Sequence, residues 1–127
     1  MSHEFIGGNF TLADGTQLPL SKAVRAGDLV FLSGQLGLDG SGKLATGIET
    51  QTNHCIDNIE AILRLAELDL TRVIKATVWL TDISDFKAFN TVYAQRFATA
   101  PPVRSTVCSA LALPGALVEI EVTAYAG

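Results

Sequence analysis

The chain has 127 residues, of which 48% are hydrophobic and 17% are charged, and its net charge is −4. This length suits one domain with a single core, so we expect one domain over residues 1–127. The nine Lys and Arg residues are scattered rather than clustered, which argues against a nucleic-acid partner. No stretch approaches the roughly 20 apolar residues of a membrane helix, so we expect no membrane partner.

Two further features of composition suggest assembly and compartment. Charged residues usually make up about 25% of a domain, so the smaller share here favours a surface partly covered by another copy of the chain. The two cysteines, Cys55 and Cys108, make no disulfide framework, and Met1–Phe10 has no signal-peptide pattern. We therefore expect a cytoplasmic protein.

The first part of the chain predicts strands. A weak, glycine-interrupted strand over residues 3–12 precedes two stronger ones, Ser21–Ala26 and Leu29–Leu36, which a turn at Gly27-Asp28 joins. The stretch GSGK at residues 40–43 predicts a loop.

Helical periodicity begins at Gly47. Apolar residues then recur at steps of three and four, which predicts a helix ending near Leu68. A strand over Arg72–Leu80 follows, and then a second helix for which Ser84 is the expected N-cap. The expected buried stripe of this second helix is Phe86, Phe89, Tyr93 and Phe97.

Two strands, Val103–Ala110 and Leu117–Tyr125, close the chain after the helix-ending prolines. The order β-β-β-α-β-α-β-β predicts an α+β or mixed α/β fold, and we expect the former, with two helices on one face of a mixed sheet of about six strands. The other face of that sheet then needs cover, which again favours association.

The closing strands carry charges within apolar sequence. Alternation along Val118–Val122 places the apolar residues toward the helices and turns Glu119 and Glu121 away. We expect Arg104 also to lie off the apolar core face. Arg104 is either an anchor for an anionic substrate or a structural or solvated cation. The two glutamates are either an acid–base pair, one of them kept protonated by the other's charge, or solvated carboxylates.

Other candidate residues carry weaker signals. Cys108 is a possible nucleophile, but no His lies near it in sequence, so a packing role is favoured. His3 and His54 have no partner at ligand spacing, so we expect no metal site. Ser33–Gln35 predicts a tight turn with exposed amides and lacks the pattern of a phosphate loop.

Several stretches together resemble the Rid family, the reactive-intermediate deaminases of YjgF type. The resemblance spans about Leu18 to Tyr125, in the order SGQ, N-x-x-Y, P-x-R-S and V-E-I-E. It implies a single Rid-type domain over 1–127 with a chorismate-mutase-like fold. It also implies a homotrimer whose sheets face inward and whose ligand clefts lie between subunits. The stretches are LVFLSGQLGLD, ETQTNHCIDNIEAIL, VIKATVWLTDISDFKAFNTVYAQRF, PPVRSTV and LPGALVEIEVTAYA.

The resemblance implies hydrolysis of reactive 2-imino or enamino acids to 2-keto acids and ammonia, without metal or cofactor. The partner is then a small imine, enamine or keto acid that bears a carboxylate. Two alternatives remain: a non-catalytic trimer that binds carboxylate metabolites, and an endoribonuclease. A chorismate mutase activity would rest on likeness of fold alone.

The resemblance also implies site residues. Arg104 grips the substrate carboxylate, and Glu119 orients the attacking water. Many active members carry Tyr where this chain has Leu20, so the cleft loses a hydroxyl and favours a larger or more apolar substrate. Glu121 receives no role, and Cys108 becomes cleft wall or packing. The implied binding residues are Leu20, Ser33, Gly34, Asn90, Arg104 and Thr106.

Overall fold

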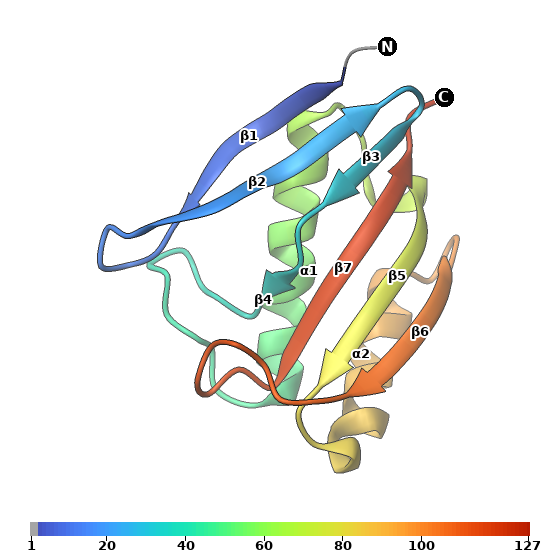
Figure 1. Ribbon diagram of the computed structural model, residues 1–127. Helices are drawn as coiled ribbons and strands as arrows, with labels where there is room; N and C mark the ends of the chain where they lie inside the picture. Colours follow the sequence, from blue (N-terminus) through green and yellow to red (C-terminus); the bar gives the residue numbers. More distant parts are fainter. Residues whose placement is uncertain (1–2) are drawn as a thin grey trace.

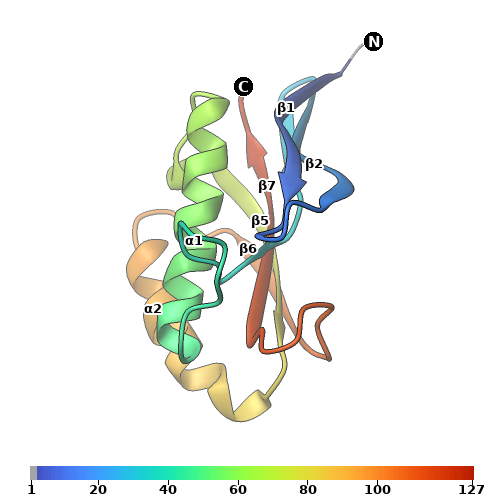
Figure 2. The ribbon, with the colours of Figure 1, turned by 90° about the vertical axis from the view of Figure 1, so that its left-hand side faces the viewer.

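Two helices lie against one face of a seven-stranded mixed sheet in the computed structural model, which describes residues 3–127 (Figure 1). Viewed edge-on, the sheet has both helices on one side and none on the other (Figure 2). The predicted α+β fold is confirmed. The helices are α1 (Ile48–Leu65) and α2 (Phe86–Arg96), and the strands are β1 (Glu4–Thr11), β2 (Gln17–Ala26), β3 (Leu29–Leu32), β4 (Gln35–Leu36), β5 (Val73–Leu80), β6 (Val103–Cys108) and β7 (Val118–Tyr125).

The strand order is β1-β2-β3-β7-β5-β6, with the two-residue β4 also paired to β7. Every pairing is antiparallel except that of β5 with β6, which is parallel because α2 connects the two strands across the sheet. The strand β6 is therefore an edge strand beside α2, as Figure 1 shows.

The strand predicted over Leu29–Leu36 is two pieces, because the chain changes partner at Ser33. The Ser33 backbone N–H donates to the carbonyl of Lys22 at 3.0 Å, and its Oγ donates to the carbonyl of Ser21 at 2.6 Å. After Gly34 the chain pairs with β7 instead, where Leu36 lies opposite Glu119. This break brings the Ser33–Gly34 backbone beside a glutamate of the central strand.

The apolar face of α1 is confirmed, with Thr52, Cys55, Ile56, Ile59 and Leu63 all fully buried. The helix ends at Leu65, three residues before the predicted end. Glu67 adopts a left-handed backbone conformation (φ 60°), and the Leu68 N–H turns back to the carbonyl of Leu63 at 2.9 Å. Such a reversal satisfies the last carbonyls and stops the helix.

The predicted N-cap at Ser84 is wrong. Asp82 is the capping side chain: its Oδ1 accepts hydrogen bonds from the Ser84 N–H at 2.9 Å and from the Ser84 hydroxyl at 2.7 Å. A short 3-10 turn over Ile83–Asp85 follows, and α2 begins at Phe86. Phe89, Tyr93 and Phe97 are buried as predicted, whereas Phe86 is 38% exposed.

Gln51 joins the start of α1 to the start of β7. Its Nε2 donates to the carbonyls of Ala45 (3.0 Å) and Gly115 (3.2 Å), and its Oε1 accepts from the Leu117 N–H at 2.8 Å. The side chain is buried, so these bonds act where water does not compete. They hold the end of β7 that leads into Glu119. No helix of the described residues is long and apolar enough to cross a membrane.

Candidate active site

The predicted site residues fall on two faces of the sheet. Arg104 pairs with Ala76, which pairs in turn with Val122, and both neighbours are buried beneath the helices. Arg104 therefore lies on the helix side, and the expectation that it avoids the core face is wrong. Glu119 pairs with Trp79 on the helix-free face, as predicted.

The first group, which we call the arginine half, comprises Arg104 and Thr106 of β6 with Phe86, Phe89, Asn90 and Tyr93 of α2. The guanidinium carbon of Arg104 lies 4.8 Å from the ring centroid of Tyr93 and 5.5 Å from that of Phe89. It also lies 5.8 Å from the ring of Phe86, which accounts for the position of that half-exposed side chain. Aromatic faces stabilise a cation without using its N–H donors.

Arg104 forms no ion pair within 4.0 Å, and its side chain forms no hydrogen bond, among residues 3–127. Its planar set of N–H donors is therefore available for a carboxylate, the group that this geometry fits best. Within the described chain, the structural ion pair considered as an alternative role for Arg104 is not formed.

Two buried hydroxyl groups lie in the arginine half. The Tyr93 hydroxyl and the Thr106 Oγ1 have no hydrogen-bond partner within the part of the chain that the structure describes. Burial raises the pKa of Tyr93, and the charge of Arg104 acts in the opposite direction. Buried polar groups without partners are rare and call for an explanation such as a functional site.

The second group, which we call the glutamate half, lines an open hollow of about 490 Å³ on the helix-free face. It brings together four of the predicted residues, Leu20, Ser33, Gly34 and Glu119, although they come from three segments of the chain: β2, the Ser33–Gly34 connection and β7. Glu121, for which the sequence predicted no role, lines the same hollow. The apolar part of the wall consists of Leu20, Val24, Phe31 and Leu32.

Glu119 is held in a setting that disfavours its charge. Burial raises the pKa of this carboxyl, and the negative charge of Glu121 raises it further. A carboxylate with a raised pKa is a better proton acceptor than an ordinary one, which suits a general base. A side chain at Gly34 would collide with the Glu119 Oε2, so glycine is required for this close approach.

The cysteines take no evident part in either half. Cys108 is exposed at the end of β6, so it does not pack in the core of a single chain, and its expected place in a cleft wall or in packing between copies stays a prediction. Cys55 is buried, and burial raises the pKa of its thiol far above the usual range, which keeps the sulfur protonated. Residues 3–127 contain no group of three His, Cys, Asp or Glu side chains arranged to bind a metal.

Sequence reasoning missed the hydroxyl of Tyr93, which it treated as part of a buried stripe. The signal was present in the spacing N-x-x-Y, because residues three apart share a helix face. Asn90 and Tyr93 therefore lie on the same side of α2 as the arginine.

Comparison with known proteins confirms the resemblance. The sequence model of the family described as endoribonuclease L-PSP matches residues 13–126. A RutC family protein of Sinorhizobium fredii is 44% identical over 113 residues, which cover 86% of this chain and 88% of that protein. The 2-iminobutanoate/2-iminopropanoate deaminase of Capra hircus is 42% identical over 111 residues, which cover 86% of this chain and 81% of that protein.

Solved structures agree in fold. The Rid family protein YyfA from Yersinia pestis superposes with a TM-score of 0.86 at 34% identity, and the match covers 98% of this chain and 99% of that one. The family match, the curated relatives and this fold coincide over nearly the whole chain. The chain thus belongs to the endoribonuclease L-PSP family, the family of the YjgF and Rid proteins.

Proposed function

We propose that the chain hydrolyses 2-imino acids and their enamine tautomers to 2-keto acids and ammonia. The observation that carries the proposal is the pair of half-sites: Arg104 has no counter-ion within 4.0 Å in residues 3–127, and burial raises the pKa of Glu119 on the opposite face of the sheet. Relatives at about 40% identity are named as imine deaminases, which supports the same reaction here.

The two halves meet, in this proposal, when copies of the chain associate. The helix-free face exposes apolar side chains, among them Phe31 (45% exposed) and Val107 (42%). Covering this face with another copy places the edge strand β6 of one copy against the hollow of the next. We propose a homotrimer of this kind, in the cytoplasm, with the cleft between subunits.

The chemistry follows from the side chains. Arg104 binds the substrate carboxylate through paired N–H donors, and fixes the imine carbon in the cleft. Glu119 of the next copy accepts a proton from water, whose oxygen attacks the imine carbon. Glu119 returns this proton to the imine nitrogen, which gives a neutral carbinolamine. A second proton then passes from the carbinolamine hydroxyl through Glu119 to the nitrogen, the C–N bond breaks, and ammonia leaves as the C=O bond of the keto acid forms. These residues supply orientation and proton transfer, so the proposed reaction needs no metal or cofactor.

Leu20 bears on substrate choice. It forms an apolar wall of the hollow together with Val24 and Phe31. We propose that this wall favours imines with apolar side chains, because burying each CH₂ contributes about 0.8 kcal/mol. Ser33, Gly34, Asn90 and the Thr106 backbone complete the proposed cleft.

The test couples an amino-acid dehydratase, which releases an imino acid, to the purified protein and measures keto-acid formation. We expect faster release with the wild type and a loss of about 100-fold in the Arg104→Ala variant, since a charge-assisted anchor contributes about 1.5–3 kcal/mol. The matched control is Lys87→Ala, which removes an exposed cation of α2. No acceleration with imines of several amino acids would overturn the proposal.

The same protein samples distinguish the alternatives. Binding of a 2-keto acid without turnover would identify a carboxylate-binding module. Cleavage of RNA that is lost in Arg104→Ala would identify an endoribonuclease, the activity in the family's description. The net charge of −4 disfavours the latter, because polyanion binding depends on clustered cations.

A further inference from the structure

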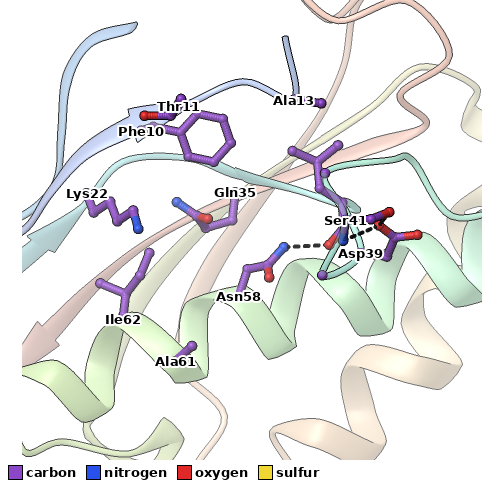
Figure 3. A pocket seen from close by; sticks show the side chains of 13 residues that line it. Phe10, Thr11, Ala13, Lys22, Gln35, Asp39, Ser41, Asn58, Ala61 and Ile62 are labelled. Atoms are coloured by element: carbon purple, nitrogen blue, oxygen red, sulfur yellow. Dashed lines mark hydrogen bonds between the residues drawn. The ribbon is translucent and has the colours of Figure 1, made fainter. Parts of the chain in front are cut away.

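A second cavity lies apart from both half-sites, between the β1–β2 hairpin, the loop after β4 and helix α1 (Figure 3). Its volume is about 360 Å³, and it shares no lining residue with the glutamate hollow. The side chains that decide its chemistry are Phe10, Lys22, Gln35, Asp39 and Ile62.

A β-bulge places a cation in this cavity. Ile6 pairs with Ala23 and Asn9 pairs with Ser21, so Gly7 and Gly8 together lie opposite the single residue Lys22. Both glycines have positive φ, 84° and 69°, which side-chain-bearing residues rarely adopt. Bulges of this kind redirect a neighbouring side chain.

The stem of Lys22 passes directly over Gly7. A Cβ at Gly7 would lie 3.2 Å from the Lys22 Cδ and 3.3 Å from the Leu65 Cδ1 of α1, so the absence of a side chain there leaves the stem its path. The ammonium extends into the cavity between Gln35 and Ile62 (Figure 3). It has no ion-pair partner within 4.0 Å in residues 3–127.

A second donor points into the same space. Gln35 is only 7% exposed, and its Nε2 donates one hydrogen to the Ser33 carbonyl at 3.0 Å, which leaves the other hydrogen available. The nearby Asn58 differs, because its Nδ2 uses both hydrogens on the carbonyls of Leu36 (3.1 Å) and Leu38 (3.0 Å). Among residues 3–127, the Lys22 ammonium and the second N–H of Gln35 thus have no acceptor within hydrogen-bond distance, an arrangement that suits an anion.

The far end of the cavity has the opposite charge. The Asp39 Oδ1 accepts from the Ser41 hydroxyl (2.7 Å), the Ser41 N–H (2.9 Å) and the Lys43 N–H (3.0 Å). These hydrogen bonds lower the pKa of Asp39 and keep its carboxylate ionised. All three are made to Oδ1, so the Oδ2 atom takes no part in them. A ligand with a second negative charge is therefore repelled there. Between the two ends, Phe10, Ala61 and Ile62 form apolar walls.

We propose that this cavity binds a small monocarboxylate with a short, unbranched apolar chain. The carboxylate accepts hydrogen bonds from Lys22 Nζ and Gln35 Nε2, and the chain lies between Phe10 and Ile62 toward Asp39. The site stands independently of the proposed deaminase activity, because none of its residues belongs to either half-site.

The test titrates hexanoate into ¹⁵N-labelled protein carrying Arg104→Ala, which removes the other proposed carboxylate anchor. We expect saturable shifts of the Gly37, Gly40 and Gly42 amides. Adding Lys22→Gln should weaken binding by about tenfold or more, since it removes a charge-assisted hydrogen bond. Lys87→Gln, on the exposed side of α2, serves as the matched control and should leave the affinity unchanged.

Two related probes test the charge at the far end. Adipate should bind more weakly than hexanoate, and Asp39→Asn should remove that difference, whereas 6-aminohexanoate should bind at least as well as hexanoate. Shifts that map away from the cavity would overturn the proposal. So would equal hexanoate affinity with and without Lys22→Gln in variants whose spectra stay dispersed.

Discussion

Arg104 and Glu119 place opposite charges in very different settings at the scale of single residues. The arginine rests on three aromatic rings, which stabilise its charge. The glutamate is destabilised as an anion by burial and by Glu121. One residue is thus prepared to hold an anion, and the other to accept a proton.

The raised pKa of Glu119 gives the proposed reaction a pH dependence. Only the ionised carboxylate accepts the proton of water, so we expect kcat/KM to rise with pH through a pKa above the ordinary value of about 4.3. Glu119→Gln should lower kcat/KM by about 100-fold and abolish this rise. An unchanged profile in the variant would show that another group titrates.

The free energy of unfolding shows whether Glu119→Gln lowers activity by disturbing the fold. A carboxyl whose folded pKa is raised favours the folded state while protonated, and this contribution is lost as pH rises through the folded pKa. Glu119→Gln should therefore gain stability relative to the wild type between acidic and neutral pH, as urea unfolding at several pH values would measure. Lost activity with retained or increased stability separates a catalytic role from a structural one.

Tyr93 offers a second residue-scale prediction. Its buried hydroxyl has no partner among residues 3–127, so the free protein bears a desolvation cost there. Tyr93→Phe should therefore leave the stability of the ligand-free protein unchanged or raise it by about 1 kcal/mol, as urea unfolding would measure. A loss of more than about 1 kcal/mol would mean that the hydroxyl already has a partner in the folded protein.

At the scale of elements, the break between β3 and β4 builds the glutamate half. Gly34 lies where the chain changes partner, and its lack of a side chain lets Glu119 approach the backbone. Gly34 and Glu119 are far apart in sequence, and the register of β4 with β7 brings them together.

Gly34→Ala tests this arrangement. The added methyl group would collide with the Glu119 carboxylate, so we expect kcat/KM to fall by about tenfold or more as Glu119 is displaced. Gly40→Ala is the matched control, because a Cβ there meets nothing within 4 Å. Equal activity of the two variants would show that Glu119 does not need its position beside Gly34.

Part of the fold and of the candidate site could be predicted from the sequence, because local periodicity determines which residues of a helix or strand share a face. The buried face of α1 and the outward direction of Glu119 follow from spacing alone. The face that Arg104 occupies does not, because it depends on the register of β6 with β5, a non-local pairing. The N-cap was misplaced for a local reason: Asp82 and Ser84 are both good capping residues, and the intervening 3-10 turn selects the first.

At the scale of the whole molecule, the proposed reaction requires more than one copy of the chain. Its arginine and glutamate halves lie on opposite faces of one sheet, so they cannot meet around one small substrate. The helix-free face, with Phe31 and Val107 exposed, is the surface through which we propose that a second copy completes the cleft.

The most direct test of this central claim mixes two inactive variants, Arg104→Ala and Glu119→Gln, by unfolding and refolding them together. If each site takes its arginine from one copy and its glutamate from the next, random mixing in equal amounts leaves about one quarter of the sites intact. We therefore expect deaminase activity near a quarter of the wild-type value, while each variant refolded alone stays inactive. Mixed oligomers that form but remain at the activity of the separate variants would contradict a site shared between copies.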